Sequence, residues 1–276
     1  MTPFRNQASP PVVLTFAASD PSGGAGIQAD VLTLSAIGCH PLSVTTALTV
    51  QDTAGVASIM AVDAEWVADQ ARMLLEDMRV DAFKIGLLGS VDNVAAIADL
   101  VADYPDVPLV LDPVLASGRG DALADEEMIA ALCELLLPLT TVLTPNTLEA
   151  RRLIERGGDS PTLVECAERL LRLGCAYVLL TGTHDATPRV VNNLYRAPCD
   201  LVRSDSWERL PGSYHGSGCT LASAVAAYLA MRRPVEAAVQ AAQDYTWRSL
   251  VAGFRPGMGQ YIPDRLFGMR KPGERA

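Results

Sequence analysis

A glycine-rich turn that carries a cysteine is the stretch of the chain best suited to chemistry. Gly216-Ser217-Gly218-Cys219-Thr220 leads into small apolar residues up to about Ala230, which predict a tightly packed helix. The first amides of a helix have no partner within it, so the turn can bind an anion, and Ser217 or Thr220 can cap it. The positive helix end also predicts a pKa for Cys219 below the usual value of about 8.5. An anion site beside an activated thiol indicates phosphoryl transfer.

The same turn also has a structural interpretation. Gly-Ser-Gly is common punctuation before a helix, and a cysteine in an alanine-rich helix is usually a small core residue. The choice between the two interpretations depends on what the rest of the chain brings to the turn.

Polar residues follow the predicted strands. Apolar segments typical of buried strands lie at 12–18, 42–50, 82–88, 109–111, 141–144 and 177–181. Polar side chains stand at the carboxyl ends of most of them: Asp20, Gln51, Asp52, Asp112, Asn146 and Thr181. Each has a structural alternative, such as an ordinary turn at Asp20-Pro21-Ser22-Gly23. Because parallel sheets bind ligands at this end of their strands, the coincidence favours a ligand site.

A short motif, Asn146-Thr147-Leu148-Glu149, opens a predicted helix and places an amide and a carboxylate one helical turn apart. These groups suit Mg²⁺, which takes a few carboxylates and keeps most of its waters, and Asp112 can supply a second carboxylate. The alternative for Glu149 is an acid in the first turn that stabilises the helix dipole. The motif leaves both interpretations open.

Strands and helices alternate along the chain. Helices are predicted at 27–37, 63–78, 92–102, 125–137, 148–155, 162–173 and 235–251. This alternation predicts an α/β fold with a mainly parallel central sheet and helices on both faces. A hairpin at 190–196 and 199–202 is expected to be the one antiparallel part. We expect a single domain at 12–262, a flexible N-terminus at 1–11 and a loose tail at 263–276.

Composition excludes several classes of function. The 276 residues carry a net charge of −10, which argues against nucleic acid or an anionic membrane as a partner. With no apolar leader, no membrane-spanning run and six scattered cysteines, we expect a cytoplasmic protein with reduced thiols and no structural zinc. The P-loop pattern is absent, and Ser22-Gly23-Gly24-Ala25-Gly26 lacks the spacing of a dinucleotide-binding turn.

Several motifs together match a known family. They are Ser19-Asp20-Pro21-Ser22-Gly23-Gly24-Ala25-Gly26, Gln51-Asp52-Thr53, Lys84-Ile85-Gly86, Thr144-Pro145-Asn146-Thr147-Leu148-Glu149 and His215-Gly216-Ser217-Gly218-Cys219-Thr220. From about Val12 to Phe254 the chain resembles the ribokinase-like superfamily and, within it, the hydroxymethylpyrimidine and phosphomethylpyrimidine kinases of thiamine biosynthesis. The superfamily usually has aspartate at the position of Cys219, and cysteine there marks the pyrimidine kinase branch.

The resemblance implies a role for each matching residue. Cys219 is implied to lie beside the substrate hydroxymethyl group as the base. The implied anion hole is Gly216, Ser217 and Gly218, the implied ATP-binding residues are Asn146, Thr181 and Thr220, and the implied metal ligands are Asp112 and Glu149. Gln51 is implied to hydrogen-bond the aminopyrimidine, which suits a side chain that both donates and accepts. Its implied pocket neighbours are Ala18, Asp30, Thr49, Leu87 and Val114.

The implied enzyme uses ATP and Mg²⁺ to phosphorylate hydroxymethylpyrimidine and its monophosphate, and homodimers are usual among its relatives. Some residues depart from the family pattern. Ala18, Thr49 and Leu87 stand where glycine, an aliphatic residue and methionine are typical. Thr181-Gly182-Thr183-His184 replaces Lys-Gly-Gly-His, and that lysine is a natural partner for phosphate charge. The second phosphorylation is therefore left open.

Three other functions also stay open. A pyridoxal or pyridoxine kinase of the same branch would use the same turn on a different ring. A ligand-binding module would keep the fold and lose catalysis. A cysteine hydrolase would need a histidine to orient the thiol, and His215 is too close along the chain to be an obvious partner.

Overall fold

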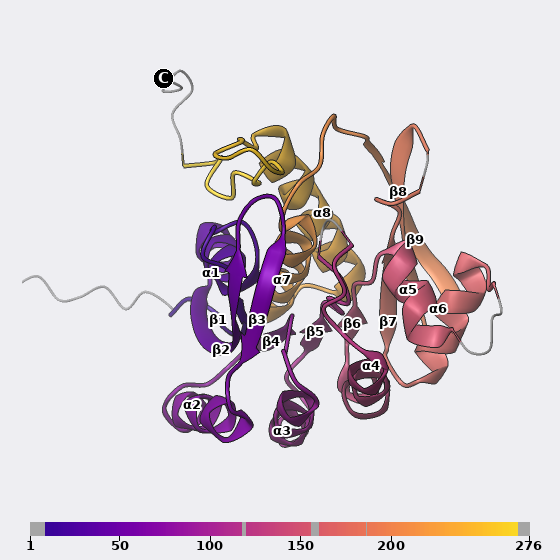
Figure 1. The fold of residues 1–276 in the computed structure, drawn as a ribbon. Helices are drawn as coiled ribbons and strands as arrows, with labels where there is room; N and C mark the ends of the chain where they lie inside the picture. The colour runs from indigo at the N-terminus through magenta and orange to yellow at the C-terminus, as the bar shows by residue number, and fades with distance from the viewer. Residues whose placement is uncertain (1–8, 118–119, 156–159, 186, 270–276) are drawn as a thin grey trace, which may run out of the picture.

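A nine-stranded sheet forms the centre of the molecule (Figure 1). The structure, a computed structural model, describes residues 9–117, 120–155, 160–185 and 187–269. The strand order is β3-β2-β1-β4-β5-β6-β7-β8-β9. The strands are β1 (Val12–Ser19), β2 (His40–Gln51), β3 (Val56–Ala61), β4 (Ala82–Ile85), β5 (Leu109–Leu111), β6 (Val142–Leu143), β7 (Tyr177–Thr181), β8 (Arg189–Arg196) and β9 (Asp200–Glu208). The block from β2 to β7 is parallel, which confirms the mainly parallel sheet.

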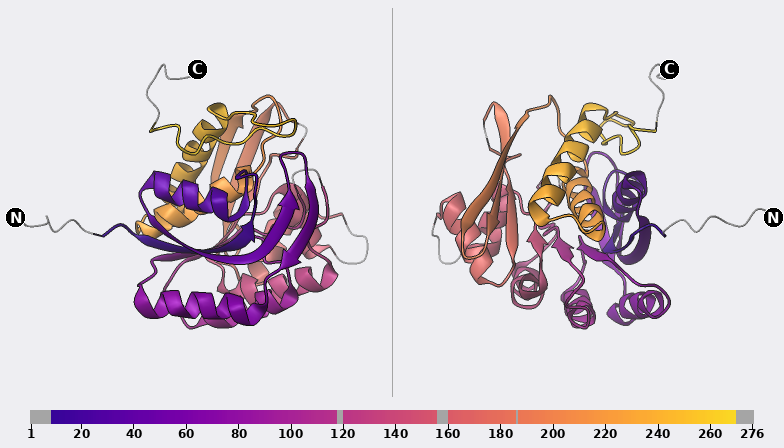
Figure 2. Two further views of the ribbon diagram at one scale, coloured as in Figure 1. Left: turned by 60° about the vertical axis from the view of Figure 1, so that its left-hand side comes forward. Right: turned by 180° about the vertical axis from the view of Figure 1, so that it is seen from behind.

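Helices cover both faces of the sheet, as predicted. They are α1 (Gly26–Ile37), α2 (Ala64–Asp77), α3 (Val91–Ala102), α4 (Glu126–Ala131), α5 (Thr147–Ile154), α6 (Leu163–Arg172), α7 (Ser217–Ala230) and α8 (Val235–Val251). A π-helical turn and a 3-10 turn continue α4 to Leu139. The helices α1, α7 and α8 lie on one face and α2 to α6 on the other (Figures 1 and 2). Neighbouring strand residues point to opposite faces of the sheet. Val13 therefore packs in the core on the side of α7 and α8, and Leu14 in the core on the side of α2 to α6.

The antiparallel part of the sheet is larger than expected. Besides the hairpin of β8 and β9, β8 pairs antiparallel with β7 and β3 pairs antiparallel with β2. The prediction of one antiparallel patch was therefore wrong. The strand β3 went unrecognised because its residues are exposed or half-buried and lack the continuous apolar character of a buried strand.

The C-terminal segment is packed as far as Phe267. Asp264 and Arg265 are only 5% and 3% exposed, and the Tyr245 hydroxyl donates to the Arg265 carbonyl at 2.7 Å. The prediction of a loose tail from residue 263 was therefore wrong for 263–267. A charged segment can pack if buried acceptors are available to its arginine. The composition of the segment does not show whether such acceptors exist. Residues 1–8 and 270–276 of the two predicted flexible ends lie outside the described residues.

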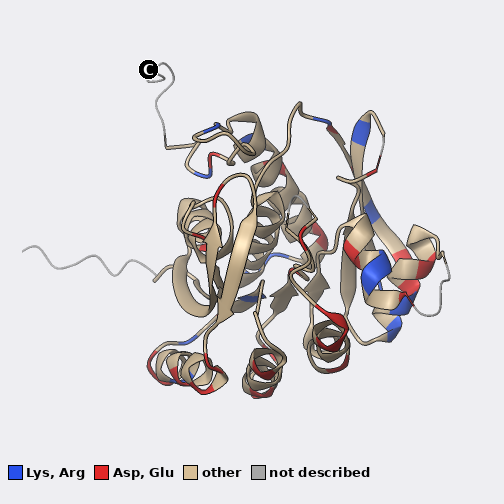
Figure 3. Ribbon diagram, viewed as in Figure 1, with Lys and Arg blue, Asp and Glu red and all other residues tan. Residues whose placement is uncertain are grey.

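The outer surface carries much acidic charge. The helices α2, α3 and α4 have acidic residues in their first turns and no basic residue in their last turns (Figure 3). Within the part of the chain that the structure describes, no helix has the length and apolar character needed to cross a membrane. Binding of an anion must therefore depend on a local site rather than on the general charge of the surface.

Candidate active site

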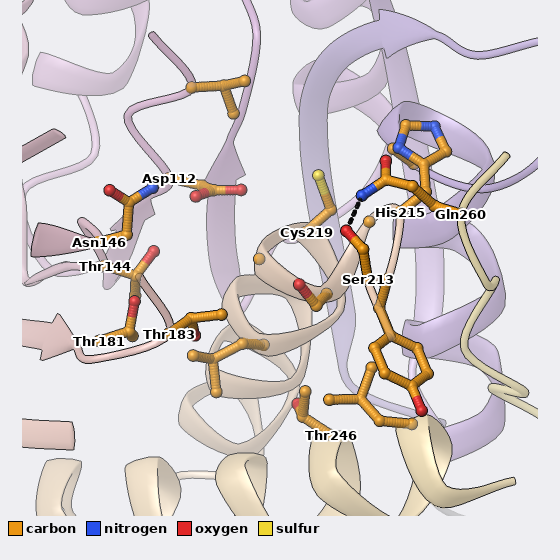
Figure 4. Close-up of a pocket in the computed structure, with 18 of the residues that line it drawn as sticks. Asp112, Thr144, Asn146, Thr181, Thr183, Ser213, His215, Cys219, Thr246 and Gln260 are labelled. Carbon is orange, nitrogen blue, oxygen red and sulfur yellow. Dashed lines mark hydrogen bonds between the residues drawn. The ribbon is translucent and has the colours of Figure 1, made fainter. Parts of the chain in front are cut away.

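A cavity of about 510 Å³ opens where the parallel strands end, beside the N-terminus of α7. Figure 4 shows Cys219 between Asp112, Asn146 and Thr181 on one side and His215 on the other. The predicted site residues that line the cavity are Ala18, Thr49, Gln51, Leu87, Asp112, Val114, Asn146, Glu149, Thr181, Gly216, Ser217, Gly218 and Cys219. Asp30 and Thr220 do not line it, and both are completely buried.

The anion turn, Gly216 to Cys219, has the free amides that the sequence predicts. Gly216 is the N-cap of α7 with φ of 79°, a left-handed conformation that favours glycine. A Cβ atom there would lie 1.9 Å from the Gly24 carbonyl oxygen, so only glycine fits. Among the described residues no side chain caps α7, and the Thr220 hydroxyl instead donates to the Gly216 carbonyl at 2.8 Å. Capping by Ser217 or Thr220 was therefore wrong, and the first amides remain available to an anion.

Asp20 holds the loop after β1 against the anion turn. Its buried carboxylate accepts hydrogen bonds from the amides of Ser22 at 2.8 Å and Ala25 at 2.7 Å, and lies 2.8 Å from His215 Nε2. Burial acts to raise the pKa of Asp20, but the hydrogen bonds from His215 and the loop together outweigh it and lower the pKa to about 2. Sequence reasoning had no signal that paired Asp20 with His215, because only the fold brings them together.

Acid should destabilise the protein through Asp20. A carboxyl group whose pKa falls on folding stabilises the folded state above its unfolded pKa, here 3.8, and loses that effect as the pH falls towards 2. The difference corresponds to about 2 kcal/mol at pH 7. We expect urea denaturation of Asp20→Asn to show a free energy of unfolding about 2 kcal/mol lower at pH 7 and a flatter dependence at acid pH. Asp52→Asn, in an exposed turn with similar amide bonds, is the control. An unchanged acid dependence in Asp20→Asn would contradict this assignment.

Cys219 is half-buried at the cavity, and its pKa is raised. Burial is the largest cause and the charges of Asp112 and Asp30 add to it, while Lys84 and the Gly26 amide act in the opposite direction. The resulting pKa is about 12. The prediction of a lowered pKa was therefore wrong, because the helix end and Lys84 do not outweigh the loss of water. At neutral pH Cys219 is therefore a thiol, close to the Asp112 carboxylate.

Iodoacetamide should modify Cys219 slowly. At pH 8 a pKa of about 12 leaves on the order of 10⁻⁴ of the group as thiolate, against roughly a quarter of an ordinary cysteine. We expect peptide mass spectrometry to show modification of Cys219 at least ~100-fold slower than that of free cysteine. A rate equal to that of free cysteine would show that the turn activates the thiol after all.

Asn146 and Glu149 form a reciprocal capping box at the start of α5. The Asn146 side chain accepts from the amides of Leu148 and Glu149 at 2.9 Å, and the Glu149 carboxylate accepts from the Asn146 amide at 2.8 Å. The structural interpretation of Glu149 therefore holds, and the same carboxylate also lines the cavity. Burial and the nearby charge of Asp112 raise the pKa of Glu149, and burial raises that of Asp112 despite Lys84.

Asp112 and Glu149 fit a divalent cation. Among the described residues, Asp112 Oδ2 is buried without a hydrogen-bond partner, and burial together with the charge of Asp112 raises the pKa of Glu149. A cation bound between Asp112 and Glu149 would give Asp112 Oδ2 a partner and would neutralise the charge of both carboxylates. No group of three or more His, Cys, Asp and Glu side chains in the described ranges is placed to hold a metal. Two carboxylates suit Mg²⁺, whose remaining ligands are waters and phosphate oxygens.

A buried ion pair lies beneath Cys219. Lys84 Nζ is 2.9 Å from Asp30 Oδ2 and both side chains are fully buried. Asp30 also accepts hydrogen bonds from the hydroxyls of Thr15 and Ser223, each at 2.7 Å. The structure thus places Asp30 as the partner of Lys84, below the predicted substrate pocket. Sequence reasoning gave Lys84 no role, although a lysine within an apolar strand was a usable signal.

The two ends of the cavity differ in character. At one end, the Gln51 amide forms no hydrogen bond with the described residues, whereas the Thr49 hydroxyl already donates to the Ser19 carbonyl at 2.8 Å. At the other end lie Trp207 and Trp247, with ring centroids 6.1 Å apart. Sequence reasoning missed both tryptophans, because they come from β9 and α8 and meet only in the fold.

Comparison with known proteins decides the family. The family model described as "Phosphomethylpyrimidine kinase" matches residues 20–264. The chain belongs to this family. The hydroxymethylpyrimidine/phosphomethylpyrimidine kinase of Streptomyces coelicolor is 40% identical over 94% of this chain and 96% of its own length. The family predicted from the sequence motifs is confirmed.

Solved structures agree with this family and with the ribokinase-like fold. The phosphomethylpyrimidine kinase of Clostridium difficile is 33% identical, with a TM-score of 0.74 over 87% of this chain and 99% of that chain. The pyridoxal kinase of Bacillus subtilis, solved as an ADP complex, is 28% identical with a TM-score of 0.83 over 93% of this chain and 98% of that chain. This member of the phosphomethylpyrimidine kinase family therefore shares its fold with enzymes that act on two kinds of ring.

Proposed function

We propose that the protein is an ATP- and Mg²⁺-dependent kinase of thiamine biosynthesis. Its substrate is 4-amino-5-hydroxymethyl-2-methylpyrimidine, and the monophosphate formed is phosphorylated again to the diphosphate. The observation that supports this most is the anion turn, whose free amides and Cys219 line one cavity with Gln51 and with Asn146, Asp112 and Glu149. That cavity offers places for a pyrimidine ring, a transferring phosphoryl group and the ATP phosphates.

The proposed roles follow from the geometry. Gln51 hydrogen-bonds the aminopyrimidine, and the amides of the anion turn stabilise the negative charge of the transferring phosphoryl group. Asp112 and Glu149 would hold Mg²⁺, which would neutralise phosphate charge. The substrate hydroxyl oxygen bonds to the γ-phosphorus as the bond to ADP breaks. Its proton passes to Cys219 Sγ as the proton of that thiol passes to an oxygen of the transferred phosphoryl group, so Asp112 remains a carboxylate able to hold Mg²⁺. A weak base suffices because the transition state is loose.

Product analysis tests the substrate and both steps. The purified protein is incubated with Mg-ATP and, separately, hydroxymethylpyrimidine, its monophosphate and pyridoxal, and the products are identified by mass. Mono- and diphosphorylated pyrimidine are expected. Monophosphate alone would show that Thr181 in place of the family lysine prevents the second step, and product from pyridoxal alone would overturn the pyrimidine assignment.

A pyridoxal kinase is the second candidate, because the Bacillus subtilis enzyme superposes well on this chain. The two candidates share the anion turn and differ in the ring that fills the other end of the cavity. Gln51→Leu separates them: it should weaken binding of the aminopyrimidine, which needs both a donor and an acceptor, while leaving the catalytic turn intact.

We also propose that the protein is a cytoplasmic homodimer. Large apolar side chains are exposed on β2, β3 and α2: Leu48, Val50, Met60, Trp66 and Met73, the last two each at 70%. Contiguous exposed apolar side chains are typical of association surfaces, and Leu48 and Met60 are direct neighbours across β2 and β3. The six cysteines form no disulfide with one another in the described part of the chain, which suits a reducing compartment. Sedimentation velocity should give twice the monomer mass of 29.3 kDa, and a monomer at micromolar concentration would contradict the dimer.

A further inference from the structure

Arg265 joins the two glycine-rich segments of the site from beneath. Its Nε donates to the Thr220 hydroxyl at 3.0 Å and its Nη1 to the Gly23 carbonyl at 3.4 Å. Its Nη2 donates to the carbonyl of Gly24 and, at 3.4 Å, to that of Gly216. The guanidinium therefore binds the loop after β1 and the anion turn at once. A planar group with five N–H donors can do this, whereas a point charge cannot.

These bonds constrain the amides of the anion turn. The C=O and N–H of a trans peptide point in opposite directions, so a Gly216 carbonyl directed at Arg265 turns the Ser217 amide away from it. Ser217 and Gly218 line the cavity. The Thr220 hydroxyl reinforces the arrangement, because it accepts from Arg265 and donates to the same Gly216 carbonyl at 2.8 Å. The Gly216 carbonyl also accepts the first helix bond, from the Thr220 amide at 3.0 Å, so Arg265 reinforces a direction of the first α7 amides that the helix itself begins.

Arg265 also brings a buried positive charge that has no paired carboxylate. Within the described ranges its side chain forms no ion pair, and its acceptors are carbonyl and hydroxyl oxygens. The charge of Lys84, by contrast, is paired with Asp30 at 2.9 Å. At 3% exposure, the charge of Arg265 is little screened by water. The charges of Asp30 and Asp20 act on the guanidinium and offset part of its charge. What remains adds positive potential behind the anion turn, where fixed dipoles and charges stabilise a developing anion.

We propose that Arg265 is a positioning residue for phosphoryl transfer. It acts through Gly216 and Thr220, holding the anion-turn amides towards the cavity, and its charge increases their attraction for the transferring group. This role rests on the proposed kinase function. It requires no contact between Arg265 and either substrate, so its removal should slow the reaction more than it weakens binding of the ring.

Kinetics of Arg265→Met and Arg265→Lys test the proposal. The acceptor used is the one that the wild type phosphorylates, pyrimidine or pyridoxal, so an error in substrate assignment does not affect the outcome. We expect Arg265→Met to lower kcat about 100-fold, as loss of an anion-hole donor does, with KM for the acceptor changed less than about threefold. Arg265→Lys keeps the charge without the planar fork and should recover part of the loss.

Arg248→Met is the matched control. Arg248, in α8, packs 4.9 Å from the ring centroid of Phe267, and Phe267 belongs to the same C-terminal segment as Arg265. Arg248 does not line the cavity. Its loss removes packing of that segment without touching either glycine-rich loop. We expect kcat of Arg248→Met to stay within about twofold of wild type, as is usual for a surface substitution away from such a site.

Thr220→Val keeps the test decisive if Arg265→Met folds poorly. Valine keeps the shape of the side chain and removes the hydroxyl between Arg265 and Gly216, so kcat should fall about tenfold. The double variant Arg265→Met/Thr220→Val should be little worse than Arg265→Met alone, because both substitutions act on one hydrogen-bond network. Circular dichroism gives the folded fraction of each variant. The proposal is overturned if Thr220→Val and folded Arg265→Met keep kcat within about threefold of wild type, or if each loss of activity merely equals the unfolded fraction.

Discussion

Cys219→Ala should lower kcat by about 10²- to 10⁴-fold, the range expected when a group that handles the transferred proton is removed. Alanine removes the sulfur that we propose to face the substrate hydroxyl. KM for the pyrimidine should change little, because Gln51 and the pocket walls remain. Steady-state kinetics with Mg-ATP and hydroxymethylpyrimidine measure both quantities.

Two further variants separate chemistry from packing at Cys219. Cys219→Ser replaces the thiol with a hydroxyl that can still accept one proton and donate another, so its kcat should lie between those of wild type and Cys219→Ala. Cys199→Ala removes another half-buried free thiol outside the cavity and should leave kcat unchanged. If Cys219→Ala keeps kcat within about threefold of wild type, Cys219 does not handle the proton.

Lys84→Met should lower the free energy of unfolding by about 3–5 kcal/mol, since it leaves the Asp30 carboxylate buried without its counter-charge. The two hydroxyl donors, Thr15 and Ser223, satisfy oxygen atoms of Asp30 but do not neutralise it. Chemical denaturation at pH 7 measures the change. A loss below about 1 kcal/mol would mean that the pair is not a buried ion pair in solution.

The double variant Lys84→Met/Asp30→Asn is the matched control. Asparagine keeps an acceptor oxygen for one of the two hydroxyls, offers its amide N–H to the other, which can accept it, and removes the unpaired charge. It should therefore recover much of the stability lost in Lys84→Met, as replacement of a whole buried pair costs less than removal of one partner. A double variant as unstable as Lys84→Met would assign the loss to packing rather than to charge.

The sequence predicted most of the fold because the parallel strands are continuously apolar and the helices have clear boundaries. The helix after Gly26, for example, ends at Gly38, which adopts φ of 103°. The edge strand β3 escaped prediction because neither of its faces is fully buried. Local pattern therefore sufficed for the parallel core and failed at the edge of the sheet.

The candidate site was predicted where a motif carries its own geometry, as at Gly216 to Cys219 or Asn146 to Glu149. It was not predicted where distant residues meet. Arg265 reaches Gly23 across 242 positions of the chain, and no local pattern marks such a contact. The pKa of Cys219 was predicted in the wrong direction for a related reason. The helix end is visible in the sequence, whereas burial and the charges of Asp30 and Asp112 depend on the fold.

A crystal structure with Mg²⁺, ADP, aluminium fluoride and hydroxymethylpyrimidine tests most directly whether phosphoryl transfer takes place at the anion turn. Aluminium fluoride mimics the transferring phosphoryl group. It should lie between ADP and the hydroxymethyl oxygen, accept hydrogen bonds from the amides of Ser217, Gly218 and Cys219, and leave the pyrimidine ring against Gln51. Aluminium fluoride bound elsewhere in the cavity, without contact to these amides, would contradict the role proposed for the turn.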